Sequence, residues 1–171
     1  TLDRSSAASD VYKRQVMVSS EVLKELTDSP SPQGIVAEVE MPELTLPTDY
    51  RGKYLILEDV QDPGNLGTII RTADAARFDG VFLSEKSADI YNQKTLRSMQ
   101  GSHFHLPIWR TDVYQLCREL QEYKTPILAT TLSKESVDYK SLPHYERLAL
   151  VMGNEGSGIS EELSLIHISE P

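Results

Sequence analysis

The residues best suited to chemistry in this chain lie in one stretch, EDVQDPGNLGTIIRTADAARFDG, at positions 58–80. Asn65, Gly67 and Arg71 combine an amide that can cap a helix, a position without a side chain, and a fixed cation. We predict a helix over 66–77 with Asn65 as its N-cap, because the amide oxygen can accept a free backbone N–H. Gly67 falls in the first turn, where a better helix former would be expected, so it suggests close approach of another group.

This predicted helix has two unlike faces. At about 100° per residue, one face collects mainly apolar side chains, namely Leu66, Ile69, Ile70, Ala73 and Arg77. Arg71 projects from a second face made of small residues, namely Thr68, Thr72 and Ala75. That face suits a partner chain or a ligand. The alternative is a solvated arginine on a capped surface helix.

A second candidate site is the loop GNEGSGIS at 153–160. Its three glycines follow an apolar run, and Ser160 can cap the next helix ahead of Glu161 and Glu162. The spacing matches neither the P-loop pattern nor G-x-G-x-x-G. Two interpretations remain: a plain strand-to-helix connection, or a loop that wraps a small cofactor through backbone contacts.

Other reactive side chains give weaker signals. His103 and His105 would share one face of a predicted strand, but no third ligand is evident, so we expect no metal site. Cys117 falls on the apolar stripe of a predicted helix and is expected in the core. Ser157 stands in G-S-G and not in the nucleophile pattern G-x-S-x-G.

The elements that would position these residues alternate along the chain. Strands are predicted at 53–59, 80–84, 103–109, 126–132 and 147–153. Helices are predicted at 66–77, at 92–101 with Asn92 as cap, and at 112–123 with Thr111 as cap. The expected fold class is therefore α/β, a mostly parallel sheet with helices on both faces. Ligands of such sheets bind beyond the carboxyl ends of the strands, so the ends near 58, 131 and 152 should converge.

The N-terminal third has a different character. Residues 1–15 are polar without a hydrophobic period, 20–29 resemble a short helix capped by Ser20, and GIVAEVEM at 34–41 alternates as a strand would. The Pro-punctuated stretch after it indicates a linker and a domain boundary.

Composition limits the class of protein. The chain has 171 residues, 17 Lys and Arg against 26 Asp and Glu, and a formal net charge of −9. A globally basic nucleic-acid binder is excluded, although residues 51–110 hold eight basic and seven acidic side chains and leave room for a local basic patch. No run approaches the ~20 apolar residues of a membrane span. The single cysteine favours a reducing compartment, so a cytoplasmic protein is expected.

Two stretches together resemble a known family. DPGNLGTIIRTADAARFDGV at 62–81 and LVMGNEGSGIS at 150–160 are similar to motifs 1 and 2 of the SpoU-type (TrmH-like) RNA 2′-O-ribose methyltransferases, within the SPOUT superfamily. SMQGSHFHLPI and SPQGIVAEV are similar to the family's segments between the motifs and at the domain junction. The resemblance implies S-adenosylmethionine as cofactor and RNA, either tRNA or rRNA, as substrate. It also implies a knotted α/β domain and a homodimer with the motif 1 helix near the subunit interface.

The resemblance also implies domains. Residues 53–163 would be the methyltransferase domain, 43–52 a linker, and 19–42 the remnant of an N-terminal RNA-binding domain. Residues 1–18 and 164–171 are expected to be non-native tails, and motif 3 of the family is missing. We therefore expect an incomplete trefoil knot and weak cofactor binding by this chain.

Site residues carry over position by position. The resemblance assigns catalytic roles to Arg71, Asn65 and Glu155. It assigns the cofactor site to backbone at the ends of two strands, namely Thr130, Thr131, Leu132, Gly153, Asn154 and Gly156. Because arginine stays protonated, Arg71 is expected to act as a cation that holds phosphate and alkoxide, and not as a base. The alternatives are a non-catalytic RNA-binding or dimerising relative, or an inactive fragment.

Overall fold

A computed structural model describes residues 15–27, 31–131 and 138–166, and the chain divides into an N-terminal unit, Thr1–Glu43, and a C-terminal unit, Leu44–Pro171. The N-terminal unit contains helix α2, Ser20–Leu26. Its N-cap is Ser19 and not the predicted Ser20, because Ser19 has extended backbone and its hydroxyl accepts from the N–H of Val22 at 3.4 Å.

The strand predicted at 34–41 is wrong for this chain. These residues carry no strand assignment, and the side chains of Ile35, Val39 and Met41 are exposed. An alternating sequence forms a strand only when a neighbouring strand supplies its hydrogen bonds, and no described residue pairs with this segment.

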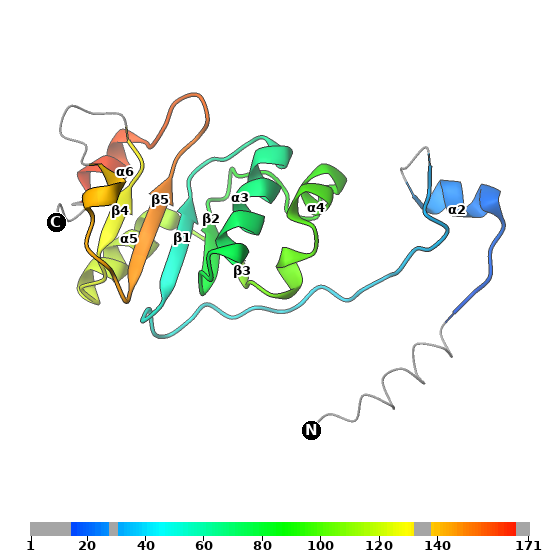
Figure 1. Cartoon of the computed structure of the whole chain (residues 1–171), viewed down its shortest axis with the longest axis horizontal. Coiled ribbons are helices and arrows are strands. Elements are labelled where there is room, and N and C mark those ends of the chain that lie inside the picture. The colour runs from blue at the N-terminus through cyan, green and yellow to red at the C-terminus, as the bar shows by residue number, and fades with distance from the viewer. Residues whose placement is uncertain (1–14, 28–30, 132–137, 167–171) are drawn as a thin grey trace, which may run out of the picture. The chain divides into compact units, whose positions relative to one another are not determined.

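The C-terminal unit is built on a five-stranded sheet in the order β3-β2-β1-β5-β4 (Figure 1). The strands are β1 (Lys53–Leu57), β2 (Gly80–Leu83), β3 (Ile108–Arg110), β4 (Ile127–Ala129) and β5 (Leu148–Met152). All neighbouring pairs are parallel, as predicted. The inner strands β1 and β2 are apolar on both faces, since both faces are covered. Strand β3 lies at an edge, as expected from Pro107.

Helices cover both faces of this sheet (Figure 1). Helices α3 (Pro63–Ala75) and α4 (Gln93–Met99) pack on one face around Leu57, Leu66 and Ile70. Helices α5 (Val113–Glu122) and α6 (Glu161–Leu165) pack on the other, where the core contains Ile56, Phe82 and Leu120. Two short 3-10 helices, η1 (Ser102–Phe104) and η2 (Tyr139–Ser141), lie in connections. The predicted α/β class is confirmed.

Two predicted helix starts are wrong by one to three residues. Helix α3 begins at Pro63 with Asp62 as N-cap, and the Asp62 carboxylate accepts from the N–H of Asn65 at 2.8 Å. Proline favours the first helical position because its missing N–H would have no partner there. Helix α5 is capped by Asp112 and not by Thr111. The Asn92 and Ser160 caps are confirmed.

The glycine in α3 serves helix packing. A Cβ on Gly67 would lie 2.5 Å from the carbonyl oxygen of Thr95 and 2.7 Å from Cβ of Ser98, both in α4. The group that approaches Gly67 closely is therefore the neighbouring helix. The predicted strand at 103–109 is also wrong in its first half, because His103 lies in η1 and His105 follows it. The two histidines do not share a strand face.

The segment expected to be a linker is mostly exposed, but it contacts the C-terminal unit at Thr45 and Tyr50. Tyr50 is buried, and the indole N–H of Trp109 donates to the carbonyl of Thr45 at 2.9 Å. Through these contacts the C-terminal unit includes residues that precede its first strand.

Candidate active site

The two sequence motifs meet at the carboxyl edge of the sheet. Strand β5 lies between β1 and β4, with Leu57 paired to Met152 and Ala129 paired to Val151. Because the strands are parallel, the polar segments that follow β1, β4 and β5 leave the same edge. The predicted convergence of these three strand ends is confirmed.

Asn65 and Glu155 form the contact between the motifs. The amide Nδ2 of Asn65 donates to Oε1 of Glu155 at 3.3 Å, and the backbone N–H groups of Gln61 and Asp62 donate to the same carboxylate at 3.4 and 3.3 Å. Burial acts to raise the pKa of the Glu155 carboxyl, but these hydrogen bonds and one from its own backbone together lower it below the usual value. Glu155 is therefore an anion that ties its loop to the start of α3.

Asn154 shapes the glycine loop from within. Its Oδ1 accepts from the N–H groups of Gly156 and Ser157 at 2.8 and 3.1 Å, and its Nδ2 donates to the carbonyl of Asp59 at 2.8 Å. The backbones of Asn154 and Gly158 exchange two hydrogen bonds of 2.9 Å. A side chain on Gly153 would overlap the backbone of Gly158, so this tight loop requires glycine at 153.

A hydrogen-bond network that was not predicted from the sequence connects the segment after β1 to the end of β2. The Asp59 N–H donates to the hydroxyl of Ser84 at 2.8 Å, and that hydroxyl donates to the Asp59 carboxylate at 2.7 Å. Asp59 has a φ of 54°, which non-glycine residues rarely adopt. The Arg110 guanidinium lies 2.8–3.0 Å from carbonyl oxygens of the following loop, namely those of Ser84, Glu85, Ser87 and Ala88. The sequence signal that could have identified this network is a polar residue at or just after the end of three strands, namely Asp59, Ser84 and Arg110.

A second missed residue is Glu58, at the end of β1. Its side chain is buried, with 2% exposed, and its carboxylate accepts from the hydroxyl of Tyr114 and the N–H of Ser160. A buried charge beside the candidate site is a signal that only the fold makes visible.

Arg71 lies on the exposed face of α3, as predicted. It is six residues after Asn65, about 9 Å along the helix axis. Among the described residues Arg71 makes no hydrogen bond or ion pair. The structure therefore joins Asn65 to Glu155 and leaves the Arg71 guanidinium available to a ligand or partner.

The residues expected to bind a cofactor occupy the adjoining strand ends. Thr130 and Thr131 are exposed just after β4, and the Thr130 N–H donates to the carbonyl of Val151 at 2.9 Å. Gly156 is exposed in the loop after β5. Leu132 lies outside the described residues. Exposed residues thus follow two adjacent strands at the carboxyl edge of the sheet.

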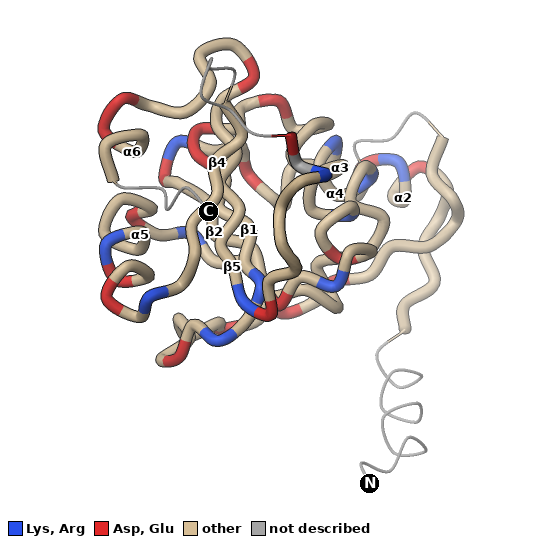
Figure 2. The backbone as a smooth tube through the Cα atoms, turned by 60° about the vertical axis from the view of Figure 1, so that its left-hand side comes forward, with Lys and Arg blue, Asp and Glu red and all other residues tan. Residues whose placement is uncertain are grey.

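Charge is mixed over the C-terminal unit. Figure 2 shows acidic and basic positions interspersed along α5. Lys94, for example, pairs with the Asp62 cap at 2.8 Å. This hydrogen bond, followed by that from the Asn65 N–H, lowers the pKa of Asp62.

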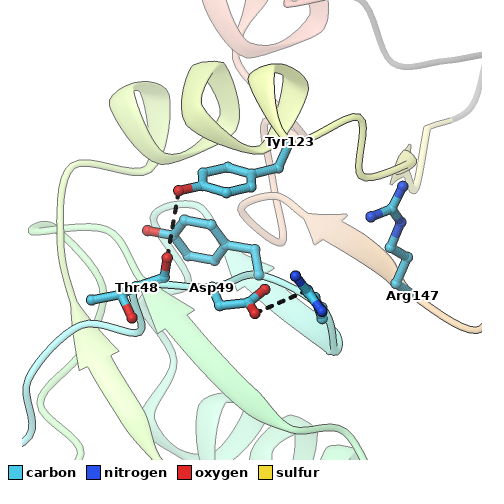
Figure 3. Close-up of a pocket in the computed structure, with 6 residues that line it drawn as sticks. Thr48, Asp49, Tyr123 and Arg147 are labelled. Atoms are coloured by element: carbon cyan, nitrogen blue, oxygen red, sulfur yellow. Dashed lines mark hydrogen bonds and ion pairs between the residues drawn. The ribbon is translucent and has the colours of Figure 1, made fainter.

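A cavity of about 310 Å³ lies at the opposite, amino end of the sheet (Figure 3). Its lining includes Tyr50, Tyr123 and Arg147, and the Arg51 guanidinium pairs with Asp49 at 3.0 Å. None of the motif residues lines it.

In the described part of the chain, no group of three His, Cys, Asp or Glu residues could hold a metal ion. Over the same residues, no helix combines the length and apolar character that crossing a membrane requires.

Comparison with known proteins identifies relatives of this arrangement. The chain is 44% identical over 147 residues to the 23S rRNA (guanosine(2553)-2′-O)-methyltransferase RlmP of Bacillus subtilis, covering 86% of the chain and 58% of that protein. It is 33% identical over 147 residues to an uncharacterized tRNA/rRNA methyltransferase of Synechocystis, covering 84% and 53%. The chain thus spans little more than half the length of these relatives.

Solved structures of methyltransferases are also similar to this chain. An rRNA methyltransferase from Sinorhizobium meliloti superposes with a TM-score of 0.80 at 30% identity, over 98% of this chain and 69% of that one. The methyltransferase AviRb from Streptomyces viridochromogenes, in complex with AdoMet, gives 0.74 at 28% identity, over 93% and 65%. The model of the SpoU rRNA Methylase family matches residues 52–167, which include both motifs and the whole sheet. The chain therefore belongs to the SpoU rRNA Methylase family.

Proposed function

We propose that the whole protein containing this chain methylates a ribose 2′-hydroxyl of RNA, with S-adenosylmethionine as the methyl donor. The observation that carries this proposal is the hydrogen bond between Asn65 and Glu155, which joins motifs 90 residues apart at the carboxyl edge of the sheet. The named activity of the Bacillus subtilis relative supports rRNA as the first substrate to test.

Cofactor binding is assigned to the ends of β4 and β5. Thr130, Thr131 and the loop from Gly153 to Gly156 would hold S-adenosylmethionine through backbone groups. When bound, this cofactor supplies an electrophilic methyl group on a positively charged sulfur. The protein's part is to hold the donor and the ribose in line, since positioning alone supplies a large share of such a rate enhancement.

The RNA side of the reaction is assigned to Arg71. A guanidinium can hold a phosphate and a developing alkoxide together through its planar fork of donors. It is not the proton acceptor in this proposal, because arginine stays protonated. Asn65 and Glu155 keep the start of α3 and the glycine loop in register, which sets where Arg71 stands relative to the donor site.

We further propose that the protein is a homodimer through α3 and acts in the cytoplasm. The exposed face of α3 holds the small side chains Thr68, Thr72 and Ala75 as well as Arg71, and the small side chains allow a second helix to approach closely. The free, buried Cys117 agrees with a reducing compartment. Light scattering should give twice the monomer mass, and Thr72→Glu should yield monomers. A monomeric wild type would contradict the dimer.

The activity is tested with the full-length protein, tritiated S-adenosylmethionine and 23S rRNA transcripts. We expect label in a 2′-O-methylated nucleotide, identified by nuclease digestion and mass spectrometry. A tRNA pool serves as the competing substrate. Label on a base, or no transfer to either RNA, would contradict the proposed function.

A further inference from the structure

The side chain of Glu58 is a buried carboxylate without a cation. It is 2% exposed, and no Lys, Arg or His in the described residues forms an ion pair with it. An isolated charge in a protein interior is expensive, and it persists only when strong donors surround it. Glu58 has two: the hydroxyl of Tyr114 at 2.7 Å from Oε1, and the N–H of Ser160 at 2.8 Å from Oε2.

These donors belong to two elements far apart in the sequence. Tyr114 lies in the first turn of α5, and Ser160 is the N-cap of α6, its hydroxyl accepting from the N–H of Leu163 at 3.2 Å. Leu163 is 2% exposed and belongs to the same core cluster as Leu116 and Cys117 of α5. Glu58 thus connects the end of β1 to the point where the chain re-enters the core.

That point is also the exit of the glycine loop. Residues 153–159 leave the sheet from β5, whose last residue accepts from the N–H of Glu58 at 2.9 Å, and they return at Ser160. One residue therefore touches both ends of the loop. The Glu58 main chain bonds the strand before it, and the carboxylate bonds the backbone after it.

We propose that Glu58 is a positioning residue that sets the geometry of the 153–159 loop for S-adenosylmethionine, with Tyr114 holding its carboxylate in place. The inference rests on the proposed function, because it assigns the loop to the cofactor. Glu58 itself has no contact with cofactor or RNA in this assignment. Its effect passes through the N–H of Ser160.

The protonation of Tyr114 agrees with this role. The hydrogen bond with Ser160, 3.4 Å between the two hydroxyl oxygens, acts to lower the pKa of Tyr114. The hydrogen bond to Glu58, burial and the Glu58 charge outweigh it, so the pKa is raised. Tyr114 therefore remains a donor at neutral pH.

Three variants separate geometry from charge. Glu58→Ala leaves the Ser160 N–H without its acceptor. Tyr114→Phe removes one donor from the buried carboxylate, together with the 3.4 Å hydrogen bond to the Ser160 hydroxyl, and leaves the Glu58 side chain itself in place. Glu58→Gln keeps the shape, since its amide oxygen can accept from Ser160 and its amide nitrogen can donate to the Tyr114 oxygen. The matched control is Tyr50→Phe, because Tyr50 donates to Glu119 at 3.1 Å in a second Tyr–Glu pair, before β1 at the amino end of the sheet.

The first readout is amide hydrogen exchange of the cofactor-free full-length protein. We expect exchange across 153–160 to rise at least tenfold in Glu58→Ala and Tyr114→Phe, in line with loss of a hydrogen bond to a charged group. Exchange in β2 should stay unchanged, and Glu58→Gln and Tyr50→Phe should match the wild type. Unchanged exchange at 153–160 in both disruptive variants would overturn the proposal.

The second readout is calorimetric affinity for S-adenosylmethionine beside affinity for the RNA. We expect the cofactor Kd to rise about tenfold in the two disruptive variants, with RNA binding unchanged and with rescue in Glu58→Gln. Equal loss of cofactor and RNA binding would mean general destabilisation and would also overturn the proposal. A wild type that binds no cofactor would instead contradict the proposed function, while the exchange data would still decide whether Glu58 holds the loop.

Discussion

Single residues at the carboxyl edge divide into those that build the site and those left to act. The side chains of Asn154, Glu155 and Asp59 form hydrogen bonds with nearby backbone and polar groups. The Arg71 side chain forms none among the described residues, although it projects from the helix that begins with motif 1. A cation that the fold does not use for its own stability is the residue whose removal should separate catalysis from folding.

Arg71→Ala in the full-length protein should lower the single-turnover methylation rate by about 10²–10³-fold, as for loss of one oxyanion donor. Unfolding free energy should change by less than about 1 kcal/mol, because the site is exposed. Cofactor affinity should stay the same. Arg71→Lys should rescue poorly, since lysine lacks the planar fork.

The control for Arg71 is Arg118→Ala, an exposed arginine of α5 on the other face of the sheet, which should retain wild-type turnover. Full activity in Arg71→Ala would end the catalytic assignment. A large loss of stability would make Arg71 structural.

At the scale of secondary structure, the packing of α3 against α4 matters most, because this helix pair covers one face of the sheet and α3 carries Asn65 and Arg71. Gly67 allows the two helices to meet, with no room for a methyl group beside Thr95 and Ser98. Helix propensity and packing therefore oppose each other at this position. Alanine would favour the helix by about 1 kcal/mol, but overpacking against backbone costs about 1–3 kcal/mol.

Gly67→Ala should consequently destabilise the protein in urea unfolding, despite the better helix former. The matched control is Gly156→Ala, where a new Cβ would meet nothing closer than 3.5 Å and φ is not positive. Its unfolding free energy should stay within about 0.5 kcal/mol of the wild type. A stabilised Gly67→Ala protein would show that α4 can move away freely.

Unfolding of the whole molecule can be followed through Cys117, which lies on α5 and is 1% exposed. Burial, and secondarily the Glu58 charge, raises the pKa of its thiol to about 12. A thiol with a raised pKa stays neutral below that pH, and the neutral form is a poor nucleophile. Native protein at pH 8 should therefore react slowly with iodoacetamide.

Alkylation should become fast in denaturant, where the thiol regains an ordinary pKa near 8.5. The midpoint of labelling, followed by mass spectrometry, should coincide with the unfolding midpoint from circular dichroism. Rapid alkylation of the native protein would show that α5 opens without global unfolding.

The sequence alone determined the alternation of elements, the parallel sheet and the two motifs. It did so because periodicity, caps and turn residues are local signals, and because parallel strands must leave a common edge. Element boundaries were predicted less well, as at α3, where Asp62 and not the predicted Asn65 is the N-cap. Residues 34–41 carried the pattern of a strand, but the pattern cannot supply the neighbouring strand that its hydrogen bonds require.

Only the tertiary structure decided which residues meet. The bond between Asn65 and Glu155 and the burial of Glu58 join positions 90 and 102 residues apart, and no local pattern encodes such pairs. At Gly67 the sequence predicted close approach of another group, and only the tertiary structure shows that this group is helix α4. A glycine or a glutamate has the same local appearance in either role. The strand order determines its neighbours, and the neighbours determine whether its charge or its missing side chain serves the fold or the site.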